Sequence, residues 1–264
     1  MGYITILDVP IAPTQTSMQL VKQFEGSVIL HPHRYNDRLE RESCKAADFI
    51  IAPSKFVQEE ITKLGVEEGK VSVIPFGANL SNGHQKDFIK NYKMDGVDFC
   101  FAGVINSRKG IEFLLEAWND EKFENDRLHL CGRLFPEIKM LLKEYRFSNV
   151  ITPGFVNTSD YFKKCDVYVF HSLLEGSSKS IYEAMNMSMP CIVTQNSGSI
   201  IKDGKDGFLI KVADSSDIRN KMLRYKQDGS QISRMGKMAY KNVQKYSWSS
   251  YAKEVVDLYK RLGV

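Results

Sequence analysis

Short apolar runs alternate with longer amphipathic segments along most of this chain, and that alternation limits the possible folds more than any other feature. Six such runs have four residues each and are rich in β-branched and aromatic side chains: 49–52, 71–74, 99–102, 128–131, 167–170 and 191–194. Adjacent parallel strands need a long crossover between them, and a helix usually supplies it. The pattern therefore predicts an α/β fold built on parallel sheets.

Three helices can be delimited from the sequence. Ser54 precedes an amphipathic run over 55–64, and Asp214 or Ser215 precedes a second run that ends at residue 227. Each of these side chains offers an oxygen acceptor to the free amides at a helix start. Apolar and aromatic residues recur near a period of 3.6 across 248–262. This periodicity predicts an amphipathic helix that packs against another surface.

A polar, glycine-bearing segment, residues 79–96, divides the chain, and we interpret it as a linker between two lobes. Residues 97–246 supply about six strand–helix units, enough for one complete Rossmann-like domain with a parallel sheet. Residues 1–78 are too short for a second complete domain of this kind, so we interpret them as the C-terminal part of one. Residues 247–264 are expected to form a closing helix that packs back toward this first domain.

Composition excludes several classes of protein. The net charge of +4 is made of 36 basic and 32 acidic residues without long blocks of one sign, so no nucleic-acid partner is expected. Five scattered cysteines are typical of buried thiols in a reducing compartment, here the cytoplasm. No apolar run is long enough to span a bilayer, although a peripheral position at a membrane stays open. No His or Cys cluster has metal-ligand spacing, so no metal site is expected.

The most specific segment runs from Glu175 to Glu183, between a strand that ends near Phe170 and a helix. The strand is joined to the helix by a loop that contains Gly176, Ser177, Ser178 and Lys179. The amides at the start of the helix are free and attract phosphate. One carboxylate lies before the helix and one about two turns into it, an arrangement suited to sugar hydroxyls on one side and a ribose on the other. The alternative is a surface glutamate beside an ordinary capped helix.

This spacing of two glutamates resembles the donor domain of glycosyltransferase family 4, whose members have the GT-B fold. The resemblance extends to further segments in the same order: 47–48, 53–57, 65–66 and 73–77 upstream, and 190–199 and 203–208 downstream. It implies transfer of a hexose from a nucleoside diphosphate sugar to a glycan or lipid-linked glycan, with retention of configuration and no cofactor beyond this substrate. By the same resemblance, Glu175 is catalytic and contacts the hexose. Donor-binding roles are implied for Gly176, Ser177, Ser178, Lys179 and Glu183.

A second segment, residues 103–110, follows the strand at 99–102 and places two cations beside the same site. Departure of the sugar leaves negative charge on a phosphate, which Arg108 and Lys109 would stabilise as catalytic residues. Many family members have an arginine where this chain has Val104, so we expect Arg108 to substitute for it. The alternative for Arg108 is a solvated charge at a helix start. Gly103, at the start of this segment, is assigned to donor binding.

Residues 153–156 resemble the loop whose backbone meets the nucleotide base in the family. Val156 is assigned to donor binding through its main chain, whereas Phe155 next to it could equally be a core residue.

This sequence lacks the signature motifs of other enzyme classes. Neither G-x-G-x-x-G nor a P-loop is present, and there is no Asp-x-Asp pair for a metal-dependent transferase, which favours a metal-independent reaction. Relatives also have a glycine-rich loop and a histidine in the first domain. This chain has Pro13 near the expected place of the histidine, and His31 and His33 are assigned no role.

These absences support an alternative from another class: a non-catalytic nucleotide-sugar-binding fragment, or one chain of a split enzyme. Its partner would then be a complementing N-terminal lobe. On this interpretation the isolated chain binds donor and is inactive in transfer.

Overall fold

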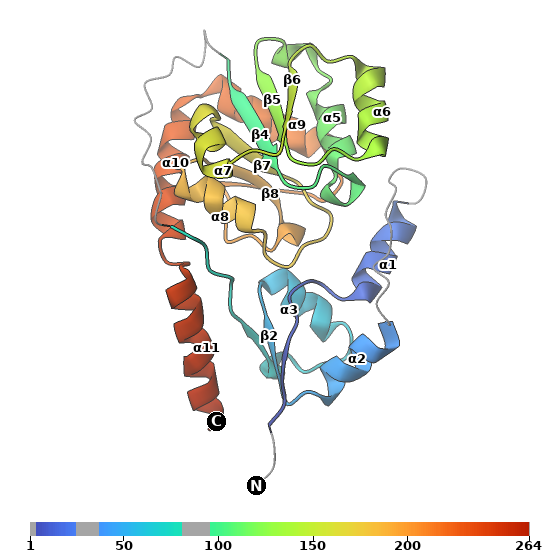
Figure 1. Cartoon of the computed structure of the whole chain (residues 1–264), viewed down its shortest axis with the longest axis vertical. Coiled ribbons are helices and arrows are strands. Elements are labelled where there is room, and N and C mark those ends of the chain that lie inside the picture. The colour runs from blue at the N-terminus through green and yellow to red at the C-terminus, as the bar shows by residue number, and fades with distance from the viewer. Residues whose placement is uncertain (1–3, 25–36, 81–95, 264) are drawn as a thin grey trace.

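The computed structural model describes residues 4–24, 37–80 and 96–263, which form two lobes placed one above the other (Figure 1). The small lobe contains residues of the range 4–80 and the large lobe residues 96–246. Both sheets are parallel, which confirms the predicted α/β class. Within the described ranges, no helix has both the length and the apolar character needed to cross a bilayer.

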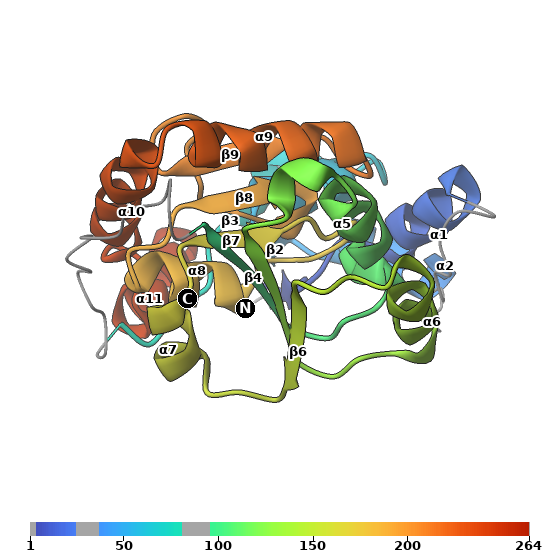
Figure 2. The same ribbon diagram turned by 90° about the horizontal axis from the view of Figure 1, so that it is seen from above.

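The large lobe is built on a six-stranded sheet of order β6-β5-β4-β7-β8-β9. Its strands are β4 (Asp98–Ala102), β5 (Arg127–Cys131), β6 (Val150–Gly154), β7 (Val167–Phe170), β8 (Cys191–Thr194) and β9 (Gly207–Ile210). Its helices are α5 (Ile111–Trp118), α6 (Pro136–Tyr145), α7 (Thr158–Tyr161), α8 (Lys179–Asn186), α9 (Ser215–Gln227) and α10 (Ser230–Val243). Seen from above, α5 and α9 lie on one side of the sheet and α7 and α8 on the other (Figure 2).

Burial explains why the central strands have continuous apolar sequences. Every residue of β4, β7 and β8 is buried, because helices cover both faces of the sheet. Two strands of this sheet, β6 and β9, were not predicted as strands. β6 is a mostly exposed edge strand that contains Pro153, and β9 begins at Gly207 directly after a turn. β6 has no uninterrupted apolar run, and the apolar run of β9 is three residues long.

The small lobe holds a three-stranded sheet of order β1-β2-β3. Its strands are β1 (Ile6–Asp8), β2 (Phe49–Ala52) and β3 (Val71–Val73), and its helices are α1 (Thr14–Gln23), α2 (Asp37–Ala46) and α3 (Lys55–Thr62). The Ser54 side chain accepts a hydrogen bond from the Val57 amide at the start of α3. Asp214 performs the same role for α9, accepting from the Asp217 amide, so of the two predicted caps the aspartate is the one used.

The last helix, α11 (Trp248–Leu262), leaves the large lobe and lies along the small one (Figure 1). Leu258 is 3% exposed and packs with Ile51 and Ile74 of the small lobe. Other apolar residues of α11 remain in solvent, since Val256 and Tyr259 are 48% and 39% exposed. The packing area of this helix is therefore modest.

The two crossings between the lobes run side by side. The Ala78 amide donates to the Tyr246 carbonyl at 2.9 Å, and Ala78 also forms a parallel bridge with Ser247. A Cβ on Gly77 would lie 2.4 Å from the Cα of Trp248, so only glycine permits this approach. Most of the predicted linker, residues 81–95, lies outside the described residues, as do His31 and His33.

The five cysteines are all free and buried, as predicted from their positions.

Candidate functional site

The topology of the large sheet marks one place for a ligand. From β4 the chain builds outward through β5 to β6, then returns to β7 on the other side of β4. In open parallel sheets, ligands bind outside the carboxyl ends of the strands where the order reverses in this way. The loops that leave β4 and β7 contain the two segments singled out from the sequence, and the fold places them next to each other.

A short 3₁₀ turn, Ser107–Lys109, presents the two cations after β4. Gly110 ends this turn with φ of +71°, and a Cβ there would lie 2.8 Å from the carbonyl oxygen of His171. A side chain at this position would therefore be both strained and obstructed. The Ser107 hydroxyl also donates to the carboxylate of Glu112 on α5, which ties the turn to the following helix.

Both cations meet one carboxylate. The Arg108 guanidinium donates to Oε1 of Glu175 at 2.7 Å, and the Lys109 ammonium bonds the same oxygen. Lys109 is 7% exposed, and its burial lowers the pKa of the ammonium, an effect that Glu175 opposes. The Lys109 Nζ also lies 4.8 Å from the ring centre of Phe170. The structure therefore brings together the three residues assigned to catalysis, as one compact charged cluster.

The loop that carries Glu175 is held between the lobes. Leu174 is 2% exposed and belongs to the core cluster of the small lobe, with Val9 and Ala12. On the other side of Glu175, a Cβ added to Gly176 would lie 1.8 Å from the carbonyl oxygen of Pro10. Only a glycine allows the small lobe to approach the loop this closely. Sequence reasoning assigned Gly176 to donor binding, and the structure gives it a packing role as well.

The remaining residues of the segment lead into α8. The Ser177 hydroxyl is 2.9 Å from the Tyr182 hydroxyl, and the Ser178 hydroxyl is 3.0 Å from that of Ser180. No side chain caps the start of α8, so its first amides depend on other partners. The Lys179 ammonium lies 5.3 Å from the ring centre of Trp248, so the Lys179 side chain points toward α11.

Glu183 faces a different part of the lobe from Glu175. It is half-buried on α8, and its Oε2 accepts a hydrogen bond of 2.9 Å from the hydroxyl of Thr158 at the start of α7. Val156, close by on the loop after β6, is half-buried and packs on the main core. Phe155 is 86% exposed, so the core alternative for that residue is wrong. The two glutamates consequently have different partners: Glu175 bonds the two cations, and Glu183 bonds a hydroxyl.

Gly103 and Val104 begin the loop after β4. The Gly103 carbonyl approaches Gly132 of the neighbouring strand end, where a Cβ would lie 1.9 Å from it. Val104, where the family resemblance led us to expect an arginine, is apolar and 40% exposed.

Several buried polar atoms around the 3₁₀ turn were not found from the sequence. Both ring nitrogens of His171, Oδ1 of Asn106 and Oε2 of Glu112 are buried, and among the described residues the two oxygens have no hydrogen-bond partner. Burial lowers the pKa of His171 to about 3, and the Gly110 backbone offsets this only in part. Burial likewise raises the pKa of Glu112, opposed by the Ser107 hydrogen bond. A lone histidine after a strand gives no sequence signal of such an environment.

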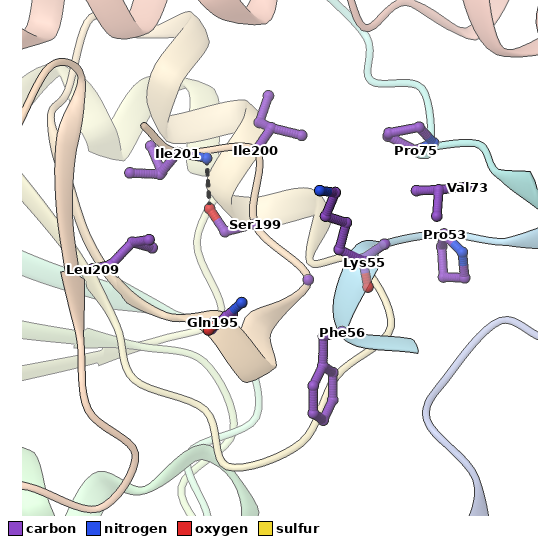
Figure 3. A pocket seen from close by; sticks show the side chains of 12 residues that line it. Pro53, Lys55, Phe56, Val73, Pro75, Gln195, Ser199, Ile200, Ile201 and Leu209 are labelled. Atoms are coloured by element: carbon purple, nitrogen blue, oxygen red, sulfur yellow. Dashed lines mark hydrogen bonds between the residues drawn. The ribbon is translucent and has the colours of Figure 1, made fainter. Parts of the chain in front are cut away.

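A cavity of about 280 Å³ opens between the lobes beside this site (Figure 3). The small lobe lines it with the end of β3 and the start of α3, where Lys55 projects into the opening. The large lobe lines it with Leu209 and with the loop after β8, including Gln195 and Ser199. The same loop supports the Glu175 segment, because the Glu175 amide donates to the Asn196 carbonyl at 2.9 Å.

The chemistry of these groups suits an anionic ligand. Two cations and the free amides of a helix start can donate hydrogen bonds to phosphate oxygens, and carboxylates can accept hydrogen bonds from hydroxyls. Among the described residues, no group of three or more His, Cys, Asp or Glu side chains is placed to hold a metal ion.

Sequence comparison decides the family. A model described as glycosyl transferases group 1 matches residues 96–228, half of the chain, and one described as glycosyltransferase family 4 matches residues 13–82. The chain belongs to the group 1 glycosyl transferases. The predicted resemblance to family 4 is thereby confirmed.

Individual group 1 relatives are similar at low identity. An uncharacterised glycosyltransferase of Methanocaldococcus jannaschii is 26% identical over 82% of this chain and 60% of its own length. The UDP-Gal:α-D-GlcNAc-diphosphoundecaprenol α-1,3-galactosyltransferase of Escherichia coli is 28% identical over 64% of this chain and 48% of its own. The chain spans 59–62% of the length of three curated relatives that it matches.

Solved structures establish the fold. Sucrose-phosphate synthase of Thermosynechococcus elongatus superposes with a TM-score of 0.80 at 20% identity, covering 99% of this chain and 68% of that one. HepE of Anabaena, in complex with UDP and glucose, gives 0.71 at 17% identity, covering 84% of this chain and 66% of that one. These similarities confirm the predicted GT-B arrangement.

Proposed function

We propose that this chain binds a nucleoside diphosphate sugar at the carboxyl ends of β4 and β7, and that the protein transfers its hexose to a glycan or a lipid-linked glycan. The observation that carries the proposal is that Arg108 and Lys109 both contact Glu175. The chain belongs to the group 1 glycosyl transferases, which supports the same conclusion. Two relatives support it. The E. coli enzyme is named for a UDP-galactose donor and a diphosphoundecaprenol-linked acceptor, and HepE was solved with UDP and glucose.

In this proposal the diphosphate replaces Glu175 as the partner of the two cations. The bond between the sugar and the β-phosphate oxygen breaks as a new bond forms to the oxygen of an acceptor hydroxyl on the same face of the sugar, with retention of configuration. The proton of that hydroxyl passes to the departing phosphate. Arg108 and Lys109 stabilise the charge that develops on the departing phosphate, and no metal ion is required. Glu175, released from the cations, accepts hydrogen bonds from the hexose. Glu183 accepts them from the ribose, and the main chain at Val156 meets the base.

Thermal and chemical unfolding with UDP, GDP, ADP and their hexose conjugates, all in the presence of chelator, tests the donor site. A ligand at about 100 times its dissociation constant should raise the free energy of unfolding by about 2.7 kcal/mol. If no nucleotide raises it, the proposed donor site is wrong. If stabilisation appears only when a divalent metal replaces the chelator, the metal-independent reaction is wrong.

Donor hydrolysis and transfer assays then separate the two classes of function. Turnover near 1 per second or faster is ordinary for an enzyme and would establish the chain as catalytic by itself. Binding without turnover would instead support the alternative of a nucleotide-sugar-binding chain that needs a complementing lobe.

A further inference from the structure

The excess positive charge of the chain lies in one short segment. Residues 230–253 contain five basic residues and no acidic residue, whereas the rest of the chain has 31 basic and 32 acidic residues. The segment comprises α10, the turn after it and the first part of α11. The net charge of the whole chain therefore gives no indication of how strongly this region is charged.

The fold gathers most of these charges on one side of α10 and of the turn that follows it. Arg234, Lys237 and Lys241 of α10 and Lys245 in the turn are exposed and follow one another at three or four residues. Met238, among them, is 46% exposed. We call these five residues the α10 basic face. The opposite side of the helix is buried against the large lobe through Ile232, Met235, Ala239 and Val243. In both views, α10 lies on the outer flank of the large lobe, on the side away from α6 (Figures 1 and 2).

The cations of this face have no carboxylate partner within the described ranges. None of Arg234, Lys237, Lys241 and Lys245 forms an ion pair there. The acidic group that interacts with Arg234 is Asp228, whose carboxylate already accepts hydrogen bonds from Ser230 and Gln231. By contrast α2, which carries three cations, contains two internal ion pairs: Arg38 with Glu42 at 2.8 Å and Arg41 with Asp37 at 2.7 Å.

We propose that the α10 basic face docks this protein on an anionic lipid bilayer. Four or more cations grouped on one helix face are the pattern that anionic headgroups attract, each cation contributing independently. The apolar side of α10 is already used by the protein core, so the helix rests on the bilayer and does not insert into it. The exposed Met238 at the centre of the face can then contact the boundary between headgroups and acyl chains. None of the five residues of this face is aromatic, which favours lipid over single-stranded nucleic acid, whose bases stack on aromatic rings.

Docking through α10 also brings the bilayer close to the proposed donor site. α10 packs directly on α8, and Gln244 donates to Asn186 at the end of α8 at 3.1 Å. α8 begins with the segment after Glu175, so about one helix diameter, ~10 Å, separates the bilayer surface from that helix. A lipid-linked acceptor at the membrane would be held near the donor, an advantage that rests on the proposed function. Vesicle binding itself does not require activity, so the two proposals can fail independently.

Co-sedimentation with vesicles tests the docking surface. The full chain should sediment with phosphatidylcholine vesicles containing about 30% phosphatidylglycerol, and not with pure phosphatidylcholine. Lys237→Glu/Lys241→Glu should lower the partition coefficient about tenfold or more, and Met238→Ser about two- to threefold. Because the contact is electrostatic, about 0.5 M NaCl should release the protein.

The matched control is Lys139→Glu/Lys143→Glu on α6, which makes the same change in net charge at exposed positions on the far flank. This variant should keep the wild-type partition coefficient within about twofold. The proposal is overturned if the wild-type chain ignores anionic vesicles, or if the α6 variant loses as much binding as the α10 variant. It is also overturned if single-stranded RNA, added at the same total negative charge as the anionic lipid, displaces the protein from vesicles completely. That result would assign the face to nucleic acid.

Discussion

The six-stranded sheet has a charged cluster at each end, and the two clusters are built differently. At the amino ends of the strands, Arg127 donates to both oxygens of Asp98, at 2.5 and 2.8 Å. His129 lies between Oδ1 of Asp98 and the Tyr161 hydroxyl, at 3.0 and 2.9 Å. At the carboxyl ends, two cations share one oxygen of Glu175, and buried oxygens of Asn106 and Glu112 nearby have no partner in the part of the chain that the structure describes.

This difference separates stability from function within one sheet. A fully partnered polar network holds neighbouring strands together, and a network with unmet hydrogen bonds destabilises the fold around it. The carboxyl ends retain groups that a ligand can satisfy, which is expected of a binding site. The predictions below test this division, beginning with the largest effect.

Asp98→Ala should cause the largest loss of stability. Asp98 is 4% exposed, and its removal takes away the carboxylate that Arg127 and His129 share. Breaking a buried pair costs about 3 to 5 kcal/mol, and the half-exposed Arg127 places this case near the lower value, about 3 kcal/mol. Urea denaturation measures it, with Asp98→Asn as the milder variant. An equal loss of stability in Glu175→Ala would remove the distinction between the two ends.

Acid should destabilise the carboxyl end through His171. The pKa of His171 is about 3 in the folded chain and about 6.5 when unfolded, so the unfolded state binds more protons between these values. Stability is therefore lost as pH falls from 6.5 toward 3, amounting to about 2 kcal/mol between pH 7 and pH 5. His171→Leu has no such proton to bind and should lose about 2 kcal/mol less than the wild type over this interval.

Urea midpoints at the two pH values give the comparison directly. Other acid-sensitive groups are common to both proteins and cancel in the difference. Identical pH profiles for the wild type and His171→Leu would show that His171 is solvated in solution.

Lys109→Met should weaken diphosphate binding about tenfold or more, equivalent to ~1.4 kcal/mol, with a smaller effect on nucleoside binding. Since Lys109 is 7% exposed, this loss should persist at high salt, whereas the loss from Arg108→Met, whose side chain is 28% exposed, should shrink. Titration calorimetry of UDP against uridine at two salt concentrations measures both. No loss in Arg108→Met would show that this residue does not substitute for the arginine absent at Val104.

The sequence predicted the central strands and the charged site because their residues are constrained locally. A strand such as β7 is buried on both faces and must be apolar throughout, and the spacing from Glu175 to Glu183 lies within one loop and one helix. Edge strands such as β6 were not predicted, because an exposed strand does not have to be apolar throughout.

Contacts between distant parts of the chain could not be predicted. Nothing in the local sequence indicates that Pro10 lies against Gly176, or that Thr158 holds Glu183. The burial of the His171 ring likewise depends on residues from several elements, since burial is a property of the assembled fold. Tertiary packing therefore decided the partners of each site residue, while local patterns decided which residues were candidates.

Glu175→Gln should produce the smallest and most informative change, because its effects on two ligands should differ. Removing the charge frees Arg108 and Lys109 from their shared partner, so free nucleoside diphosphate should bind about threefold more tightly. The corresponding nucleotide sugar should bind more weakly than this gain predicts, since the variant loses a charged acceptor for hexose hydroxyls. Glu183→Gln, which contacts Thr158 instead, should weaken both ligands by a similar factor. Calorimetric titration of the two variants with both ligands measures these ratios. A parallel loss for both ligands in Glu175→Gln would mean that Glu175 does not distinguish the sugar, and the two glutamates would then have to exchange their assigned roles.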